Sequence, residues 1–357
     1  MNIAIIVLGV MVTLLVVRDV WQTVLHPDAE GMVAALTRRA MWRLATGAGI
    51  RLRFRRRRIL ALAGPGIVVL TFVAWMGLLT LGLTLVFWPM GDQFASDPAL
   101  GSLTFLDTFY YVGGTVTVLG FGDITPISGL GKLLTISAAA LGFTMFTAMA
   151  SYLIEVVNGL SARDRFTLAI HDETRGRTGD VALAEFLAYE GADETRKRCR
   201  VWAAHLRGVD EMVHRYPLVA LTYRSRRAEY DPEPALRRCA EAAAAALVAV
   251  RFEPALRSAA DELATAMARL ERTIAENYLA DEVVRRLSDA EPEERDLNTV
   301  DEIHRLLAER LGPHAASVAT DGHAGEAVFR ARVFLSSLRD WSRADVSGYE
   351  WGAGSNA

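Results

Sequence analysis

The stretch Thr115-Val116-Thr117-Val118-Leu119-Gly120-Phe121-Gly122-Asp123 decides the fold of this 357-residue chain. Two glycines stand one residue apart in it, at Gly120 and Gly122. Glycine readily adopts positive φ, and alternating the sign of φ along an extended backbone turns successive carbonyl oxygens to the same side. The stretch therefore predicts a row of carbonyl oxygens along one side of the backbone.

A short helix is predicted directly before this stretch. Thr104, followed three residues later by Asp107, resembles a capping box, which marks the start of a helix. Apolar side chains then continue at near-helical spacing, so we expect a helix that runs to about Val116. These side chains are Phe105, Phe109, Val112 and Val116.

Three apolar stretches are long enough to cross a bilayer, which takes about 20 residues of helix. The first, residues 1–17, is uncharged and lacks the basic start and small-residue cleavage site of a signal peptide. The second, 59–88, holds no ionisable side chain and ends in two aromatic residues. The third, 133–154, is uncharged and rich in small residues that allow close helix packing. We expect a multi-pass membrane protein, with a buried soluble helix hairpin as the poorer alternative.

The short helix and the two glycines lie between the second and third apolar stretches. Non-helical backbone at membrane depth is tolerated only where it is buried in protein or lines an aqueous path. The carboxyl end of the short helix carries partial negative charge and favours a cation. Four such segments around one axis make stacked rings of oxygens that replace the water around a dehydrated cation. The sequence therefore predicts a cation pore built by four copies of the chain.

Residues 59–158 resemble the two-helix pore module of the potassium channel superfamily, whose filter is commonly Thr-Val-Gly-Tyr-Gly-Asp. The resemblance implies an all-α membrane protein with an outer helix, a pore helix, a filter and an inner helix. It implies a homotetramer that passes potassium ions and needs no cofactor. The implied ion-binding residues are Val118, Leu119, Gly120, Phe121 and Gly122, supported by Thr115, Thr117, Tyr111 and Asp123. A gating hinge at Gly142 and a cavity lined by Phe146, Ala150, Ser151 and Ile154 are implied as well.

The sequence departs from this family in the filter and behind it. Val118 stands where the family threonine adds a hydroxyl to the innermost ion site, which should therefore bind ions more weakly. An alternative register makes Thr117 the filter threonine, at the cost of one extra residue. Gly114 replaces a glutamate of some members, and Phe121 lacks the tyrosine hydroxyl. Tyr111 is expected to donate a hydrogen bond to Asp123.

Arginines set the expected orientation in the membrane. Residues 26–58 hold many arginines, among them the run Arg55-Arg56-Arg57-Arg58, and positive residues stay in the cytoplasm. This places the amino terminus outside and the carboxyl-terminal half inside the cell. The same run predicts contact with anionic lipid headgroups. A nucleic-acid patch is the weaker alternative, because the net charge of the chain is -3.

From Arg163 onward the chain is rich in Ala, Glu and Arg and predicts a soluble, nearly all-α domain. One apolar stripe ends at Tyr216 and consists of Trp202, Leu206, Val209 and Val213. Further helices are predicted at about 256–288, 296–311 and 324–341. The expected organisation is 1–27, an amino-terminal transmembrane helix; 28–58, an Arg-rich cytoplasmic linker; 59–158, the pore domain; 159–345, the cytoplasmic helical domain; and 346–357, a disordered tail.

Several functional classes find no support in the sequence. No nucleophile and base stand in a catalytic arrangement, so we expect no enzyme activity, and the seven histidines show no compact metal-ligand spacing. No helix carries arginine at every third residue, as a voltage sensor would. Two alternatives to a potassium channel stay open. One is a non-selective cation channel, and the other is a membrane receptor that uses a non-conducting pore as a scaffold.

Overall fold

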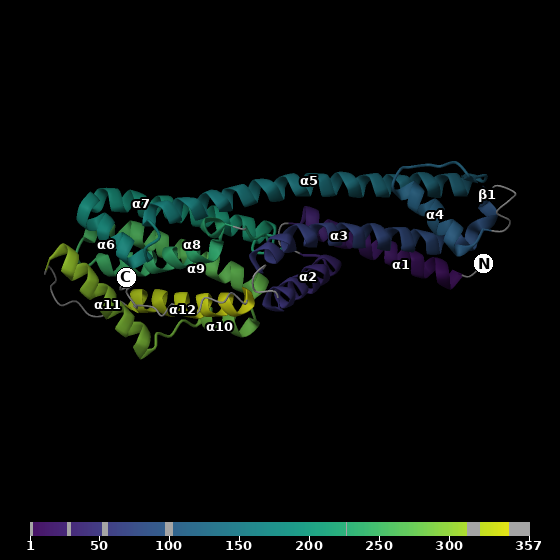
Figure 1. Ribbon diagram of the computed structural model, residues 1–357. Coiled ribbons are helices and arrows are strands. Elements are labelled where there is room, and N and C mark those ends of the chain that lie inside the picture. Colours follow the sequence, from purple (N-terminus) through teal and green to yellow (C-terminus); the bar gives the residue numbers. More distant parts are fainter. Residues whose placement is uncertain are drawn as a thin grey trace. The chain divides into compact units, whose positions relative to one another are not determined.

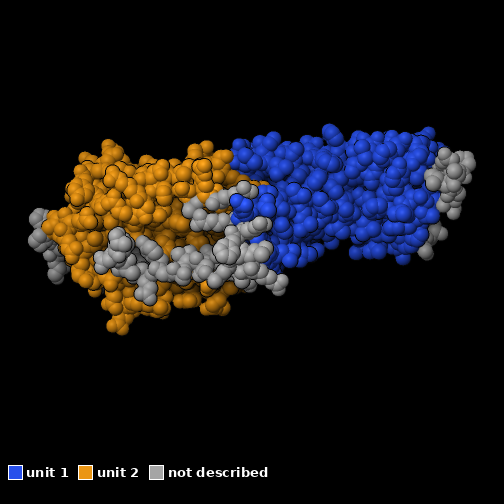
Figure 2. All heavy atoms as spheres, viewed as in Figure 1, with its two compact units in different colours: residues 1–158 blue, residues 159–357 orange. Residues whose placement is uncertain are grey.

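The computed structural model describes residues 3–26, 30–51, 56–96, 103–225, 227–312 and 322–342. The chain divides into two compact units, residues 1–158 and 159–357 (Figure 2). Unit 1 is mostly helical and holds one short two-stranded ribbon (Figure 1). Its elements are α1 (Ile3–Val20), a π-helical turn η1 (Trp21–Leu25), α2 (Met32–Arg51), α3 (Arg56–Phe87), a 3-10 turn η3 (Trp88–Gln93), β1 (Phe94–Ser96), α4 (Phe105–Val116), β2 (Ile124–Pro126) and the start of α5 (Gly129–Thr174).

Three helices among the described residues are long and apolar enough to span a membrane. They cover Ile3–Leu25, Arg58–Gln93 and Gly129–Thr174. Each contains one of the apolar stretches that the sequence predicts as a span, apart from the two undescribed residues at the amino terminus. The prediction of an all-α membrane protein is thus confirmed, with one small antiparallel ribbon of β1 and β2 added to it.

Small residues bring α1 and α3 into close contact, and the two helices lie side by side (Figure 1). A Cβ added to Gly9 would lie 2.6 Å from the carbonyl oxygen of Gly82. A Cβ on Gly82 would in turn lie 2.6 Å from the hydroxyl of Thr13. Only glycine fits at this crossing, because any larger side chain would push the two backbones apart.

The end of α1 binds the beginning of α2 through Asp19. This carboxylate is 3% exposed and accepts hydrogen bonds from the backbone N–H groups of Val33 (2.9 Å) and Ala34 (3.3 Å). The indole N–H of Trp75 on α3 donates a third bond at 2.8 Å. The first turn of a helix has unpaired N–H groups and partial positive charge, which stabilise a carboxylate there. Asp19 therefore joins three helices at one point.

Helix α2 occupies most of the segment that the sequence presents as a linker. It packs along α3, where the hydroxyls of Thr37 and Thr71 lie 2.6 Å apart. A Cβ on Gly66 of α3 would come within 2.5 Å of the methyl carbon of Met41. The side chains of Arg55, Arg56 and Arg57, where headgroup contact is predicted, lie outside the described residues.

Unit 2 is a bundle of helices around α8, an alanine-rich helix. Its residues 242–246 are alanines that are no more than 2% exposed, as expected for a helix surrounded by others. The predicted stripe on α7 is confirmed, since Trp202, Leu206, Val209 and Val213 are all buried. The elements are the end of α5, α6 (Gly179–Glu190), α7 (Ala192–Arg215), η5 (Ala228–Tyr230), α8 (Pro232–Ala249), η6 (Pro254–Leu256), α9 (Arg257–Tyr278), α10 (Asp281–Ser288), α11 (Glu294–Leu311) and α12 (Gly322–Ser342).

The predicted helix over 256–288 is two helices, because the chain leaves helical geometry at Leu279 (φ −105°, ψ 179°) before α10 begins. The predicted helices over 296–311 and 324–341 correspond to α11 and α12. The tail at 346–357 lies outside the described residues.

Candidate functional site

Helix α4 begins with the capping box that the sequence predicts. The backbone N–H of Asp107 donates to the Thr104 hydroxyl (3.2 Å), and the Asp107 carboxylate accepts from the Thr104 N–H (2.9 Å). The helix ends at Val116, as expected. Beyond it, the N–H of Leu119 donates to the carbonyl of Gly114 at 2.8 Å, so the chain turns back along the helix before it extends.

The backbone after α4 alternates in the sign of φ. Val118, Gly120 and Gly122 have φ of 61°, 59° and 86°, whereas Leu119 and Phe121 between them do not have positive φ. Positive φ is free of cost for glycine but strained for a β-branched residue, by about 1–3 kcal/mol. Val118 is therefore held in a conformation that its side chain disfavours, in register with the two glycines.

The side chains of this stretch lie on the open surface of the single chain. Val118, Leu119 and Phe121 are 58%, 63% and 62% exposed. Nothing lies within 4 Å of a Cβ built on Gly120 or Gly122. Apolar groups and backbone exposed in this way at membrane depth need other protein or an aqueous path beside them.

The two threonines of the site use their hydroxyls on α4 itself. Thr117 donates to the carbonyl of Gly113 at 2.7 Å, and Thr115 donates to the carbonyl of Tyr111 at 2.9 Å. Thr117 has φ −84° and ψ 1°, which makes it the cap of the helix. The alternating segment accordingly starts at Val118.

Tyr110 faces the alternating segment. Its ring stacks on Phe121, with the centroids 5.4 Å apart and the planes at 10°. Its hydroxyl interacts with the carboxylate of Asp123. This is the partnership that the sequence assigns to Tyr111, and the assignment is off by one residue. Neighbouring residues on a helix point about 100° apart, so Tyr110 and Tyr111 face different elements.

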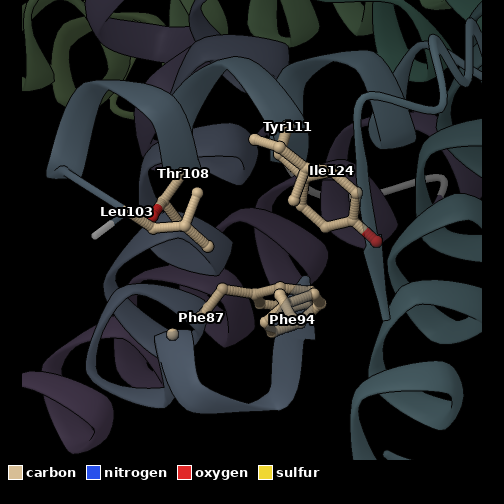
Figure 3. Close-up of a pocket in the computed structure, with 7 residues that line it drawn as sticks. Phe87, Phe94, Leu103, Thr108, Tyr111 and Ile124 are labelled. Carbon is tan, nitrogen blue, oxygen red and sulfur yellow. The ribbon is translucent and has the colours of Figure 1, made fainter. Parts of the chain in front are cut away.

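Tyr111 points away from the alternating segment, toward α5 and a cluster of aromatic rings. Its hydroxyl lies 2.8 Å from the hydroxyl of Thr135 on α5. Its ring lies 5.3 Å from that of Phe94, which stacks on Phe87 at 5.5 Å. Figure 3 shows the two phenylalanines together, with the ring of Tyr111 beside them. The cluster fixes the back of α4 against the end of α3.

The short ribbon holds the segment that follows Asp123. Strand β2 pairs antiparallel with β1, placing Ile124 opposite Ser96 and Pro126 opposite Phe94. The backbone after the alternating segment is thus attached to the end of α3. Strands this short leave almost no pattern in the sequence. The one signal is that apolar Ile124 and Ile127 flank Thr125-Pro126, which indicates an ordered connection.

Gly142 is the point where α5 meets the end of α4. A Cβ on this glycine would overlap the carbonyl group of Val116. Helix α5 runs unbroken through Gly142, from Gly129 to Thr174. Gly142 thus allows α5 to pack closely against the end of α4. Its function as a gating hinge stays a prediction.

The residues predicted to line a cavity share one face of α5. Ala150, Ser151 and Ile154 are exposed, whereas Met149 and Tyr152 are buried. Phe146 is 43% exposed and also contacts α3, because its ring lies 5.0 Å from that of Phe72. In the single chain, no other described element covers this face between Ala150 and Ile154.

A cavity of about 280 Å³ lies between α4, the alternating segment and α5. It brings together most of the residues that the sequence assigns to the filter and its support. No group of three or more His, Cys, Asp or Glu side chains in the described part of the chain could hold a metal ion. The lining includes Tyr110, Tyr111, Gly114, Thr115, Val118, Gly120, Phe121, Gly122 and Asp123.

A half-helix, an alternating segment and a long following helix define the class of this membrane unit. Residues 70–158 of this multi-pass membrane protein match the family model described as an ion channel. Over 121 residues the chain is 30% identical to the uncharacterized membrane protein YdjJ of Bacillus subtilis (strain 168). That match covers 33% of this chain and 36% of YdjJ, about a third of the relative's length. No solved structure matches the chain.

Proposed function

We propose that four copies of the chain form a potassium-selective channel that passes potassium ions down their gradient. The observation that supports this most is the alternation of φ at Val118, Gly120 and Gly122, directly after the carboxyl end of α4. Alternation aligns the carbonyl oxygens of Val118–Phe121 on one side, and the negative end of α4 favours a cation there. Rings of such oxygens replace the hydration shell of the ion.

Fourfold assembly follows from the single alternating segment of each chain. One segment covers only one side of an ion, so four are needed to surround it. Neighbouring subunits would also cover the exposed side chains of Val118, Leu119 and Phe121 and leave the face of Ala150, Ser151 and Ile154 on a central cavity. Association in detergent that stops at the dimer would contradict this assembly.

The innermost ion site is proposed to lack a hydroxyl ring. Thr117 caps α4 and bonds its own helix, and the alternation starts one residue later, at Val118. Both observations support the ungapped register, in which Val118 takes the place of the family threonine. Potassium would then be held at this site by carbonyl oxygens alone, with weaker affinity.

The proposed topology places the amino terminus outside the cell and unit 2 in the cytoplasm, following the arginines before α3. Unit 2 would modulate the opening of the pore and not build it, since every predicted filter residue lies in unit 1. The arginine run at 55–58 would contact anionic headgroups of the inner leaflet. No enzyme activity, nucleic-acid binding or cofactor forms part of this proposal.

A flux assay on purified protein in liposomes tests the proposal, with potassium or sodium gradients imposed separately. We expect potassium flux well above sodium flux. Equal fluxes would indicate the non-selective cation channel, and no flux from folded tetramers would indicate the receptor scaffold.

Two glycine variants make the flux assay specific to the filter. Gly120→Ala places a side chain at φ 59°, with nothing within 4 Å of its Cβ, so it strains the backbone without a clash. Gly77→Ala also has nothing within 4 Å but lies in α3, where alanine suits the helix. Potassium flux should fall at least tenfold in Gly120→Ala and stay unchanged in Gly77→Ala.

A further inference from the structure

Glu271 is a carboxyl group placed in the alanine-rich core of unit 2. It lies on α9, is 2% exposed and borders a cavity of about 10 Å³ between α8, α9 and α12. A cavity of this size holds about one water molecule. Burying a charged carboxylate among apolar side chains is costly unless it is paired. The other lining residues are Ala240, Ala243, Ala264, Met267, Ala268, Ala327 and Arg330.

Arg330 stands between Glu271 and a second carboxylate near the surface. Its Nε lies 3.9 Å from Oε2 of Glu271, and its Nη1 lies 3.8 Å from Oε2 of Glu326. Glu326 is one turn earlier on α12, and its side chain is 40% exposed, against 3% for Glu271. Neither distance is that of a close ion pair. One arginine is thus shared by two carboxylates, one buried and one in contact with solvent.

Charged groups on the other helices that contact α9 are engaged elsewhere. Arg200 and Arg207 of α7 pair with Glu262 of α9, more than two turns before Glu271. Arg285 of α10 pairs within α10, and Arg286 pairs with the segment after it. Glu241 of α8 accepts a hydrogen bond from the N–H of Gly179 at the start of α6, and η6 carries no charge. Arg330 is the charged group that acts on Glu271. The other interactions are Arg200–Glu262, Arg207–Glu262, Arg285–Glu282, Arg286–Glu293 and Glu241–Gly179.

We propose that Glu271 makes unit 2 a proton sensor: the protonated group allows α12 to dock on α9, and the ionised group, whose burial Arg330 compensates only in part, loosens that docking. The ionised form is resisted by the apolar cavity, and Arg330 offsets only part of this cost. Docking of α12 therefore depends on the proton. The step from docking to ion flux rests on the proposed channel function, whereas the sensor itself does not.

The direction of the response follows from burial. Burial raises the pKa of Glu271 from 4.5 to about 8, and Arg330 counteracts this in part. In an undocked α12 the carboxyl would titrate near its ordinary pKa. The proton therefore stabilises docking fully below about pH 4.5, and this stabilisation is lost as the pH rises toward the docked pKa of about 8. Above that pH both states are ionised and no further loss is expected.

Hydrogen exchange of α12 in the full-length protein tests the sensor directly. Protection is measured from about pH 6 to about pH 9 and corrected for the pH dependence of intrinsic exchange. In the unmodified protein, protection should fall by up to tenfold per pH unit and level off near pH 8, since one pKa unit corresponds to a factor of ten. In Glu271→Gln, which cannot ionise, the fall in corrected protection between about pH 7 and pH 8, above the range in which Glu241 titrates, should disappear.

Two further variants separate the sensor from general destabilisation. Arg330→Gln removes the charge that supports ionised Glu271, so the fall in protection should continue above pH 8. Glu326→Gln removes a carboxylate from the same arginine but leaves Glu271 able to titrate, so the fall should persist. If Glu271→Gln does not fold, the contrast between Arg330→Gln and Glu326→Gln decides the matter. Equal pH slopes in the unmodified protein and Glu271→Gln, or no extension in Arg330→Gln, would overturn the sensor.

Ion flux in liposomes, with the same pH on both sides, shows whether the sensor reaches the pore. Flux should change over the range in which α12 loosens, and Glu271→Gln should remove that change. A pH dependence of flux that survives in Glu271→Gln would contradict control by this group. Absence of flux from all of the proteins would count against the channel, while the exchange experiment would still decide on the sensor.

Discussion

The hydroxyls of Tyr111 and Thr135 lie 2.8 Å apart and join α4 to α5. Because Thr135 donates its own proton to the carbonyl of Gly131 at 2.8 Å, Tyr111 is the donor in the pair. The bond lies on a different face of α4 from the one that Tyr110 turns toward the alternating segment. Together with the contact of Gly142 with Val116, it attaches the middle and the carboxyl end of α4 to α5, so that a shift of α5 is expected to reach the alternating segment through α4.

The first prediction concerns this hydrogen bond. Tyr111→Phe keeps the ring among Phe87 and Phe94 but removes the donor, which should lower stability by about 1 kcal/mol. Potassium current should also decline faster during sustained opening. Thr135→Val should act in the same way, and the double variant should cost little more than either alone, as for partners in one interaction. Additive losses in thermal unfolding would show that the two hydroxyls act separately.

The second prediction concerns the ion site at Val118. Val118→Thr adds a hydroxyl to each subunit at nearly constant shape, so internal barium should block at least tenfold more strongly, four oxygens each contributing on the order of 1 kcal/mol. Thr117→Val should change block little, because the Thr117 hydroxyl is bonded to Gly113. The register would be wrong if block fell in Thr117→Val and did not rise in Val118→Thr.

Most of the elements around the site could be predicted because their signals are local. The capping box at Thr104 and the apolar spacing up to Val116 defined α4, and three uncharged stretches marked the membrane helices. Helix α2 was missed because its arginines suggested a linker, whereas its packing on α3 depends on contacts such as Thr37 with Thr71. Contacts between residues far apart in sequence leave no pattern in either segment alone.

Within the site, the glycine positions predicted the backbone conformation correctly, whereas the contacts of the two tyrosines could not be predicted. Gly120 and Gly122 have the positive φ that the alternation requires. The adjacent Tyr110 and Tyr111 could be told apart only by the rotation of α4, which the packing against Phe87 and Phe94 sets. The junction at Asp19 could not be predicted either, because its three donors come from α2 and α3.

The third prediction concerns Asp19. Asp19→Leu leaves the N–H groups of Val33 and Ala34 and the indole of Trp75 without their buried acceptor, at a cost of about 1–3 kcal/mol for each group. The protein should then unfold or aggregate at clearly lower temperature. Asp19→Asn retains one acceptor oxygen and should lose less, and Trp75→Phe, which removes a single donor, should lose least. Equal melting of Asp19→Leu and the unmodified protein would contradict this function of Asp19.

The last prediction concerns a second buried carboxyl, Glu241 on α8. It is 4% exposed and accepts a hydrogen bond from the backbone N–H of Gly179 at 2.8 Å. Burial raises its pKa from 4.5 to about 7, although the Gly179 N–H favours the ionised form. The folded protein thus holds this proton more tightly than the unfolded chain. Its contribution to stability is complete below about pH 4.5 and is lost as the pH rises to about 7.

Glu241→Gln should make that part of the pH dependence disappear. The amide oxygen can still accept from Gly179 but cannot ionise, so the variant should gain up to about 1.4 kcal/mol per pH unit relative to the unmodified protein between about pH 4.5 and pH 7, and nothing more above. Denaturant unfolding of unit 2, followed by the fluorescence of Trp202, measures the difference at each pH. Glu293→Gln is the control, because Arg332 and Arg295 lower the pKa of that carboxyl, so its loss should not change the slope between pH 5 and 7. A stability difference between Glu241→Gln and the unmodified protein that is constant with pH would mean that Glu241 does not titrate in this range.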